Sequence, residues 1–329
     1  MTGRLIQPVI MAGILLAFAC PAPPASGAEI RITPVQMNAE NRDEKTIGNL
    51  TWRGGFAMTM ENPLFGGLSG LEVSPDGRRL LAVTDNGYWL RAELTYRDGD
   101  LAGIRNAELA PLLGQDGRPL GSKPWSDAES LAPLSPDSFV VAFERHHRLW
   151  RYDGAPDPSR ARPVAIPVPP AFSKLPANGG IEALTRLCNG NLLAIAERNR
   201  TARGHVDAWL QSGSGWDHLT YLVSNGLRPT AATTLPDCDI LIVERSFSFI
   251  AGLGIRIVRI PSNAIRPDAV LVPREIARMT HSVIIDNFEG ISSRRNEIGE
   301  TLVYIVSDDN FSPLQRSLLV MYRLDDTER

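Results

Sequence analysis

Lysine and cysteine are scarce in this chain of 329 residues, and long apolar runs are absent beyond its N-terminal segment. The only lysines are Lys45, Lys123 and Lys174, so arginine supplies nearly all of the positive charge. A net charge of −3 without a clustered basic stripe excludes the electrostatic footprint of a nucleic-acid-binding protein. No segment after residue 28 approaches the roughly eighteen apolar residues of a transmembrane helix, so we expect no membrane-spanning segment.

The first 28 residues have the features of an export signal. Arg4 is the only charge before an apolar run over residues 9–19, and Ser26-Gly27-Ala28 offers small residues for cleavage. Cys20 is an alternative site of lipid attachment, although the usual aliphatic residue three positions earlier is missing. We therefore expect cleavage after Ala28, a periplasmic or secreted protein, and a single mature domain over residues 29–329.

One phrase recurs along the chain: a carboxylate, a small residue and an aliphatic residue, then about fifteen residues later an apolar strand that ends in an acid. Three complete copies begin at Glu129-Ser130-Leu131, Glu182-Ala183-Leu184 and Glu289-Gly290-Ile291, and a less complete copy begins at Ser69-Gly70-Leu71. A fifth copy keeps only the second half, after Pro229-Thr230-Ala231. The mean spacing of about 55 residues fits one four-stranded propeller blade with variable loops, and five to six such units fit the mature chain.

Hairpin signals accompany each copy, because turn residues precede a short aliphatic strand and a second strand follows it. Residues 29–62 carry strand-like runs without the phrase, and we expect them to supply missing strands and to close the last blade. Residues 274–279 are the one short helix candidate. The pattern predicts an all-β protein, a β-propeller.

The repeated acids should gather at one end of such a ring, since a hairpin returns the chain to the rim where it began. The candidate metal ligands are Asp85, Glu129, Glu144, Glu182, Glu197, Glu244, Glu289, Asp308 and Asp309. Carboxylates that face one funnel repel one another unless cations or arginines neutralise them. Calcium, a hard ion that prefers oxygen ligands, suits such a site outside the cytoplasm. The alternative is structural: the acids cap backbone amides or pair with arginine between blades.

The last repeat has the densest polar cluster, with Asp286-Asn287-Phe288-Glu289-Gly290 before the strand and Ser307-Asp308-Asp309-Asn310-Phe311 after it. We expect a metal site here and take Glu289 and Asp308 as the candidate catalytic residues.

Three Glu-Arg dipeptides place Arg145, Arg198 and Arg245 at equivalent positions. At the rim these arginines would bind a phosphate or carboxylate of a substrate. Inter-blade salt bridges are the alternative.

Cys188 and Cys238 are the two cysteines of the mature chain, and each precedes an apolar strand in neighbouring repeats. An oxidising compartment favours a disulfide between them, and two half-buried thiols are the alternative. No metal-ligand spacing involves either cysteine, so zinc is not expected.

Several catalytic motifs are absent. No G-x-S-x-G elbow, P-loop, dinucleotide fingerprint or H-E-x-x-H occurs, and the five histidines are scattered. The sequence therefore favours metal-assisted attack by water over a serine nucleophile.

The phrases resemble the phytase-like domain family, also called the esterase-like activity of phytase family, which is common in secreted bacterial proteins. The resemblance lies in residues 66–71, 85–86, 180–184 and 197, and most closely in residues 286–291 and 307–312. It implies a six-bladed propeller related to phytases in which calcium ions in an acidic channel bind substrate phosphates and activate water. Because Pro229-Thr230-Ala231 stands where the other units carry the phrase acid, and because lysine is nearly missing, phytate itself is not the expected substrate.

Two functions follow from these observations. The first is a secreted, calcium-assisted hydrolase of a small phosphate ester or other ester. The second is a non-catalytic, calcium-stabilised propeller that binds a cell-envelope ligand or partner, since propellers serve many unrelated functions.

Overall fold

The structure is a computed structural model that describes residues 29–135, 138–154, 157–201, 203–213, 215–224, 226–248, 252–280 and 282–325. The predicted signal peptide and Cys20 lie outside these ranges.

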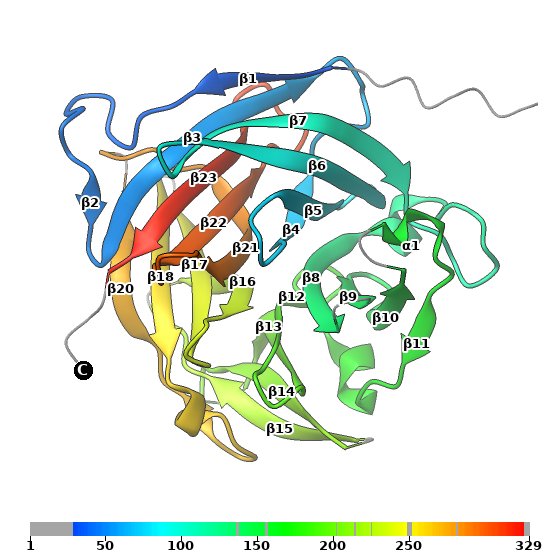
Figure 1. The fold of residues 1–329 in the computed structure, drawn as a ribbon. Helices are drawn as coiled ribbons and strands as arrows, with labels where there is room; N and C mark the ends of the chain where they lie inside the picture. Colours follow the sequence, from blue (N-terminus) through cyan, green and yellow to red (C-terminus); the bar gives the residue numbers. More distant parts are fainter. Residues whose placement is uncertain are drawn as a thin grey trace, which may run out of the picture.

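Five sheets surround a central axis in the described part of the chain, and each forms one blade (Figure 1). Blade 1 consists of β4 (Leu68–Val73), β5 (Arg79–Thr84), β6 (Tyr88–Arg97) and β7 (Asp100–Pro111). Blade 2 consists of β8 (Ala128–Ser135), β9 (Ser138–Phe143), β10 (Arg148–Asp153) and β11 (Val164–Ile166). Blade 3 consists of β12 (Ile181–Arg186), β13 (Leu192–Arg200), β14 (Val206–Ser212) and β15 (Gly215–Tyr221), with β19 (Val270–Leu271) at its outer edge.

Both ends of the described chain contribute to the remaining sheets. Blade 4 consists of β16 (Arg228–Thr234), β17 (Ile240–Ser248), β18 (Gly252–Ile260) and β20 (Arg274–Met279). Blade 5 consists of β21 (Asn287–Arg295), β22 (Thr301–Asp308), β23 (Ser317–Leu324), β3 (Leu50–Met60) and β1 (Ile30–Pro34), and β2 (Thr46–Ile47) pairs with β3. The only helices among the described residues are α1 (Lys123–Ser126) and the 3-10 turns Pro158–Arg160, Pro170–Lys174 and Ser262–Ala264.

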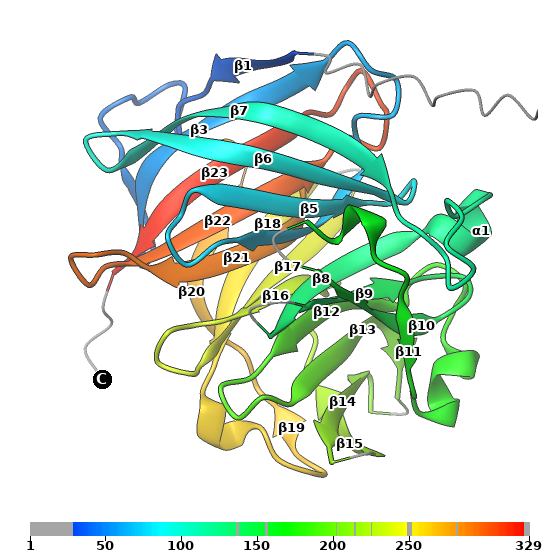
Figure 2. The same ribbon diagram turned by 45° about the vertical axis from the view of Figure 1, so that its right-hand side comes forward.

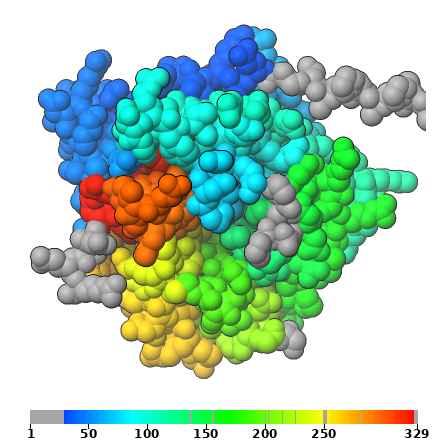
Figure 3. All heavy atoms as spheres, in the orientation of Figure 1, coloured from blue at the N-terminus to red at the C-terminus, as the bar shows by residue number. Residues whose placement is uncertain are grey.

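The prediction of six blades is wrong, because the described strands form five. The N-terminal strands do not build a sheet of their own. Instead β3 pairs with β23, so strands from both ends of the chain share blade 5 and close the ring. The space-filling view shows the red C-terminal segment against the blue N-terminal one (Figure 3), and Figure 2 shows β6 and β7 of blade 1 beside β3 and β23. The helix candidate at residues 274–279 is also wrong, since it forms the outer strand β20.

A β-bulge in each inner strand explains the recurring phrase. The pairing register of all five inner strands shifts at one equivalent residue, which is Ser69, Glu129, Glu182, Thr230 or Glu289. A bulge leaves the extra residue out of the ladder and redirects its side chain. The first residue of the phrase is therefore the bulged residue of its blade.

The small residue that follows the bulge lets neighbouring inner strands approach closely. A Cβ on Gly70 would lie 2.6 Å from the Leu131 backbone nitrogen of the next blade, and one on Gly290 would lie 3.0 Å from the Leu71 Cβ. The aliphatic third residue then packs between blades: Leu71, Leu131 and Ile291 are at most 4 % exposed. Truncating such a core leucine to alanine typically costs about 2–5 kcal/mol of stability.

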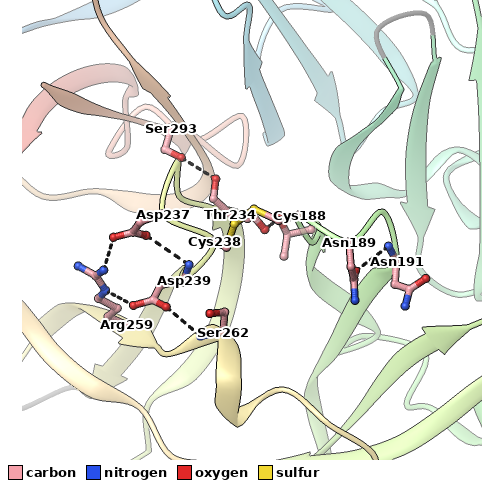
Figure 4. Close-up of a disulfide and its surroundings, with 11 residues drawn as sticks. Cys188, Asn189, Asn191, Thr234, Asp237, Cys238, Asp239, Arg259, Ser262 and Ser293 are labelled. Carbon is pink, nitrogen blue, oxygen red and sulfur yellow. Dashed lines mark hydrogen bonds and ion pairs between the residues drawn. A yellow bond between two sulfur atoms is a disulfide. The ribbon is translucent and has the colours of Figure 1, made fainter. Parts of the chain in front are cut away.

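A disulfide joins blades 3 and 4. Cys188 lies in the turn between β12 and β13, Cys238 lies in the turn between β16 and β17, and their Cα atoms are 5.5 Å apart (Figure 4). The cysteines are therefore not two free thiols. Both turns lie at the end of the ring opposite to the one where the inner strands begin. None of the helices that the structure describes is long and apolar enough to cross a membrane.

Candidate functional site

The strand-terminal acids lie at equivalent places on one rim of the ring. The backbone N–H of Asp85 donates to the Gly67 carbonyl at 2.8 Å, that of Glu144 to the Asp127 carbonyl at 2.8 Å, and that of Glu197 to the Gly180 carbonyl at 2.9 Å. In blades 4 and 5 the equivalent acids are paired in register: Glu244 with Pro229, and Asp308 with Asn287. Each acid thus lies beside the residue that leads into its inner strand. These carboxylates therefore lie together on one rim, as the repeat predicts.

Three carboxylates of blade 2 form the tightest acidic group. Asp127, Glu129 and Glu144 each offer an oxygen, and these oxygens all lie within 4.8 Å of one another. Burial raises the pKa of Glu129 well above its usual range, and the charges of Glu144, Glu182 and Asp127 raise it further. An all-oxygen donor set with such repulsion is the chemistry that a hard divalent cation satisfies.

Unpartnered oxygens adjoin this group. Glu182 is 8 % exposed, and its Oε2 has no hydrogen-bond partner among the described residues. Burial raises the pKa of Glu182, and the charges of Glu197 and Glu289 add to that effect. The Oδ1 of Asp85 is likewise buried without a hydrogen bond, although Oδ2 of the same side chain pairs with Lys123. Orphaned carboxylate oxygens at a polar rim are costly unless a cation occupies the site, so the residues present fit a bound metal ion.

Cations of the protein already neutralise part of the group. The Arg145 Nε lies 2.5 Å from Asp127 Oδ2, and the Lys123 Nζ lies 3.1 Å from Asp127 Oδ1. Gly179 and Gly180 donate backbone N–H groups to Oε1 of Glu144, the second at 2.6 Å. These contacts orient Asp127 and Glu144. The Glu129 side chain has no hydrogen bond to another described residue, so it is the member most available to a cation.

The residues of the metal site predicted in the last repeat form a hydrogen-bonded network. Asn287 Nδ2 donates to Glu289 Oε1 at 2.9 Å and to Asp308 Oδ2 at 3.4 Å. Asp309 accepts from the Gly67 N–H at 3.1 Å and from Ser317 Oγ at 3.0 Å, so it ties blade 5 to blade 1. Burial and the charge of Glu289 raise the pKa of Asp308 to about 8. Its surroundings therefore favour the protonated form of Asp308.

Two other sequence candidates pair with the protein itself. Glu244 is fully buried; it accepts from Tyr221 Oη at 2.7 Å and forms an ion pair with Arg256. Glu197 forms an ion pair with Arg198, whose Nε lies 2.5 Å from Oε2. Neither residue belongs to the tight acidic group of blade 2.

The arginines of the Glu-Arg dipeptides have mixed positions. Arg245 of blade 4 contacts Glu289 of blade 5 at 2.5 Å and Glu197 of blade 3 at 3.7 Å, which is an inter-blade role. Arg145 and Arg198 pair within their own blades, and their side chains are 36 % and 38 % exposed, so both also reach solvent.

A cavity of about 990 Å³ opens beside the acids of blades 3, 4 and 5. Its lining includes Arg198, Arg228, Arg245, Arg316 and Asn287. This volume is at the upper end of the usual range for small-molecule sites.

Sequence reasoning missed four residues of this rim. Asp127 was detectable, because Asp127-x-Glu129 repeats the spacing of Asn287-x-Glu289. Lys123, Arg228 and Arg316 left no signal, since all three lie outside the repeated phrase: Lys123 begins α1, Arg228 begins β16 and Arg316 lies in the loop before β23.

Comparison with known proteins gives one family. The family model described as "Phytase-like: Esterase-like activity of phytase" matches residues 63–311. No curated protein matches the sequence.

Two solved structures have weak similarity to the fold. A hypothetical protein from Leishmania major is 10 % identical with a TM-score of 0.43, and the match covers 81 % of this chain and 87 % of that one. A protein from Thermus thermophilus, provisionally assigned as an oxidoreductase (glucose dehydrogenase), is 12 % identical with a TM-score of 0.37. The match covers 78 % of this chain and 98 % of that one. Neither similarity bears on function at these scores.

Proposed function

Because the chain belongs to the phytase-like family, we propose that it hydrolyses small phosphate esters or related esters with the help of calcium at the acidic rim of its propeller. The observation that carries the proposal is the group Asp127, Glu129 and Glu144, whose oxygens lie within 4.8 Å of one another. The Glu129 side chain lacks a hydrogen-bonding partner among the described residues. The burial and neighbouring negative charges that raise the pKa of Glu129 are the unfavourable interactions that a bound cation would relieve.

Asp127, Glu129 and Glu144 would hold calcium, together with the unpartnered Oε2 of Glu182. When bound, the ion supplies positive charge that polarises the ester and lowers the pKa of water.

Asp308 and Glu289 divide the proton transfers in this proposal. Asp308, with its pKa raised to about 8, carries a proton that it would donate to the leaving oxygen. Glu289, held by Asn287 and Arg245, would accept the proton of the attacking water. Arg145, Arg198 and Arg245 would bind the anionic part of the substrate through guanidinium hydrogen bonds.

The test is release of nitrophenol from nitrophenyl phosphate and nitrophenyl acetate, each in calcium and in EDTA. We expect turnover in calcium alone, no turnover for Glu129→Gln, and a loss of about 100-fold or more for Asp308→Asn. Glu61→Gln is the matched control, because this glutamate is 74 % exposed and pairs with Arg31 of the outer strand β1. Calcium binding without turnover of either substrate would favour the non-catalytic propeller that binds a cell-envelope ligand.

We also propose that residues 1–28 direct export to the periplasm or medium. The Cys188–Cys238 disulfide supports this, since disulfides persist mainly in oxidising compartments. A mature N-terminus at Glu29, read by mass spectrometry of protein from the extracytoplasmic fraction, is the expected result. A chain that retains Met1 in the cytoplasm would contradict it.

A further inference from the structure

Three guanidinium groups converge on one buried carboxylate at the mouth of the ring. The Glu197 side chain is fully buried, and Arg198 Nε lies 2.5 Å from its Oε2. Arg228 Nη1 lies 3.5 Å and Arg245 Nη2 lies 3.7 Å from its Oε1. Glu197 cannot neutralise three cations, so positive charge remains at this point although Arg245 is shared with Glu289.

The same imbalance holds for the whole cavity that these arginines line. Four arginines and two carboxylates, Glu197 and Asp286, belong to its wall, and the fourth arginine is Arg316, with its Nε 3.5 Å from Asp286 Oδ2. When Glu289, the 2.5 Å partner of Arg245, is counted as well, an excess of one positive charge remains. This excess and the unused guanidinium donors suit the anionic group of a phosphate monoester. Arg228 and Arg316 are 42 % and 49 % exposed, so their remaining donors are accessible.

Part of the cavity wall is apolar. Phe247, Leu253, Ile285 and Leu314 line it, and Phe247 and Leu314 are 67 % and 92 % exposed. A polar polyol would leave these side chains in contact with polar groups, whereas an alkyl or aryl group would cover them.

We propose that this cavity binds phosphate monoesters whose alcohol part is apolar or aromatic, with the phosphate against the four arginines and the alcohol against Phe247 and Leu314. The proposal names a substrate class for the hydrolase function proposed above, and it rests on that function for the cleavage of the bound ester. Asn287 connects the two sites, because it lines the cavity and donates to both Glu289 and Asp308. The substrate class is thus an amphipathic phosphate ester, and a highly phosphorylated polyol does not fit it.

Calorimetric binding in EDTA tests the cavity without the calcium site. The probes are methyl, butyl and hexyl phosphate, with glycerol phosphate as a polar match for butyl phosphate. We expect affinity to rise with chain length, by up to about fourfold per methylene, and butyl phosphate to bind more tightly than glycerol phosphate. Equal affinity for the three alkyl phosphates, or tighter binding of glycerol phosphate, would overturn the proposal.

Two exposed residues allow variants that keep the fold. Arg228→Met should weaken the binding of all alkyl phosphates by about tenfold or more, because it removes one charge-assisted contact. Leu314→Asn should leave the affinity for methyl phosphate unchanged and reduce the increase in affinity from methyl to hexyl phosphate. The matched controls are Arg118→Met, at a side chain that is 86 % exposed, and Ile298→Asn, at a residue that is 79 % exposed, and both positions lie outside the cavity lining. Unchanged binding by Arg228→Met would refute the anion site.

Turnover separates this proposal from the hydrolase function. Calcium-dependent hydrolysis without chain-length preference would refute the amphipathic pocket and leave the hydrolase intact. Binding with the expected preference, but no hydrolysis in calcium, would support the pocket and refute the hydrolase. A last experiment mixes the protein with vesicles that contain phosphatidic acid. Co-sedimentation of the protein with the vesicles identifies a lipid as the source of the ester. Tight binding of hexyl phosphate without co-sedimentation identifies a soluble ester.

Discussion

Glu72 offers a quantitative test of how the inner strands tolerate carboxyl groups. It lies on β4, where Ser292 Oγ of β21 donates to its Oε2 at 3.3 Å, and it has no ion pair with another described residue. Burial raises the pKa of Glu72 from 4.5 to about 8, and the Ser292 hydrogen bond opposes the shift only in part. The folded protein therefore binds one proton more than the unfolded chain between these pH values.

The sign of the effect follows from this proton. Stability falls as pH rises from 4.5 to about 8, and it is unaffected by Glu72 outside that window. The full shift corresponds to at most about 5 kcal/mol at about 1.4 kcal/mol per pKa unit. Because Glu72 is only partly shielded from solvent, we expect roughly half of this, about 2–3 kcal/mol.

Glu72→Gln removes the ionisation and keeps the acceptor for Ser292. In EDTA, urea unfolding at pH 9 should show the variant to be more stable than the wild type by about 2–3 kcal/mol, and at pH 5 the two should agree within about 1 kcal/mol. The variant is compared with the wild type at each pH because other rim carboxyls titrate in both proteins. Glu61→Gln, at the exposed control position, should differ by less than about 0.5 kcal/mol at either pH. If the stability difference between Glu72→Gln and the wild type is the same at pH 5 and pH 9, Glu72 does not titrate as proposed.

Two further predictions concern the scaffold. The double variant Cys188→Ala/Cys238→Ala should lose about 4 kcal/mol of unfolding free energy, because the disulfide closes a loop with a sequence separation of 50; unchanged urea midpoints would contradict this. Gly67→Ala should destabilise the protein by more than about 1 kcal/mol, since Gly67 has φ +63° and the new Cβ would lie 2.0 Å from Asp85 Oδ1. Thermal unfolding measures that loss, and an unchanged melting temperature would show that Asp85 can move aside freely.

The repeated phrase made the propeller and its acidic rim predictable. Each unit carries its own turn, strand and acid, and the bulge at Glu129 or Glu289 recurs because the local sequence recurs. The number of blades was not predictable in the same way. It depends on β3 pairing with β23, and these strands lie at opposite ends of the chain, so no local pattern reports the pairing.

Partners outside the repeated phrase decided which acids remain available. Glu244 looks equivalent to Glu144 in the sequence, yet it pairs with Tyr221 and Arg256. Asp127 precedes the phrase and was missed, although it lies in the tightest acidic group. Local repetition therefore predicts where an acid lies, whereas its protonation and its partners depend on side chains that arrive from distant strands.

Calorimetric titration of calcium into EDTA-treated protein tests whether the acidic rim binds a metal ion. We expect the wild type to bind calcium and its melting temperature to rise with calcium. Glu129→Gln should bind calcium at least about tenfold more weakly. Its metal-free form should be at least as stable as the wild type, because one repelling carboxylate is gone. Glu61→Gln should bind as the wild type does. Wild-type affinity in Glu129→Gln, or no calcium binding by the wild type, would contradict the assignment of the acidic rim as a metal site.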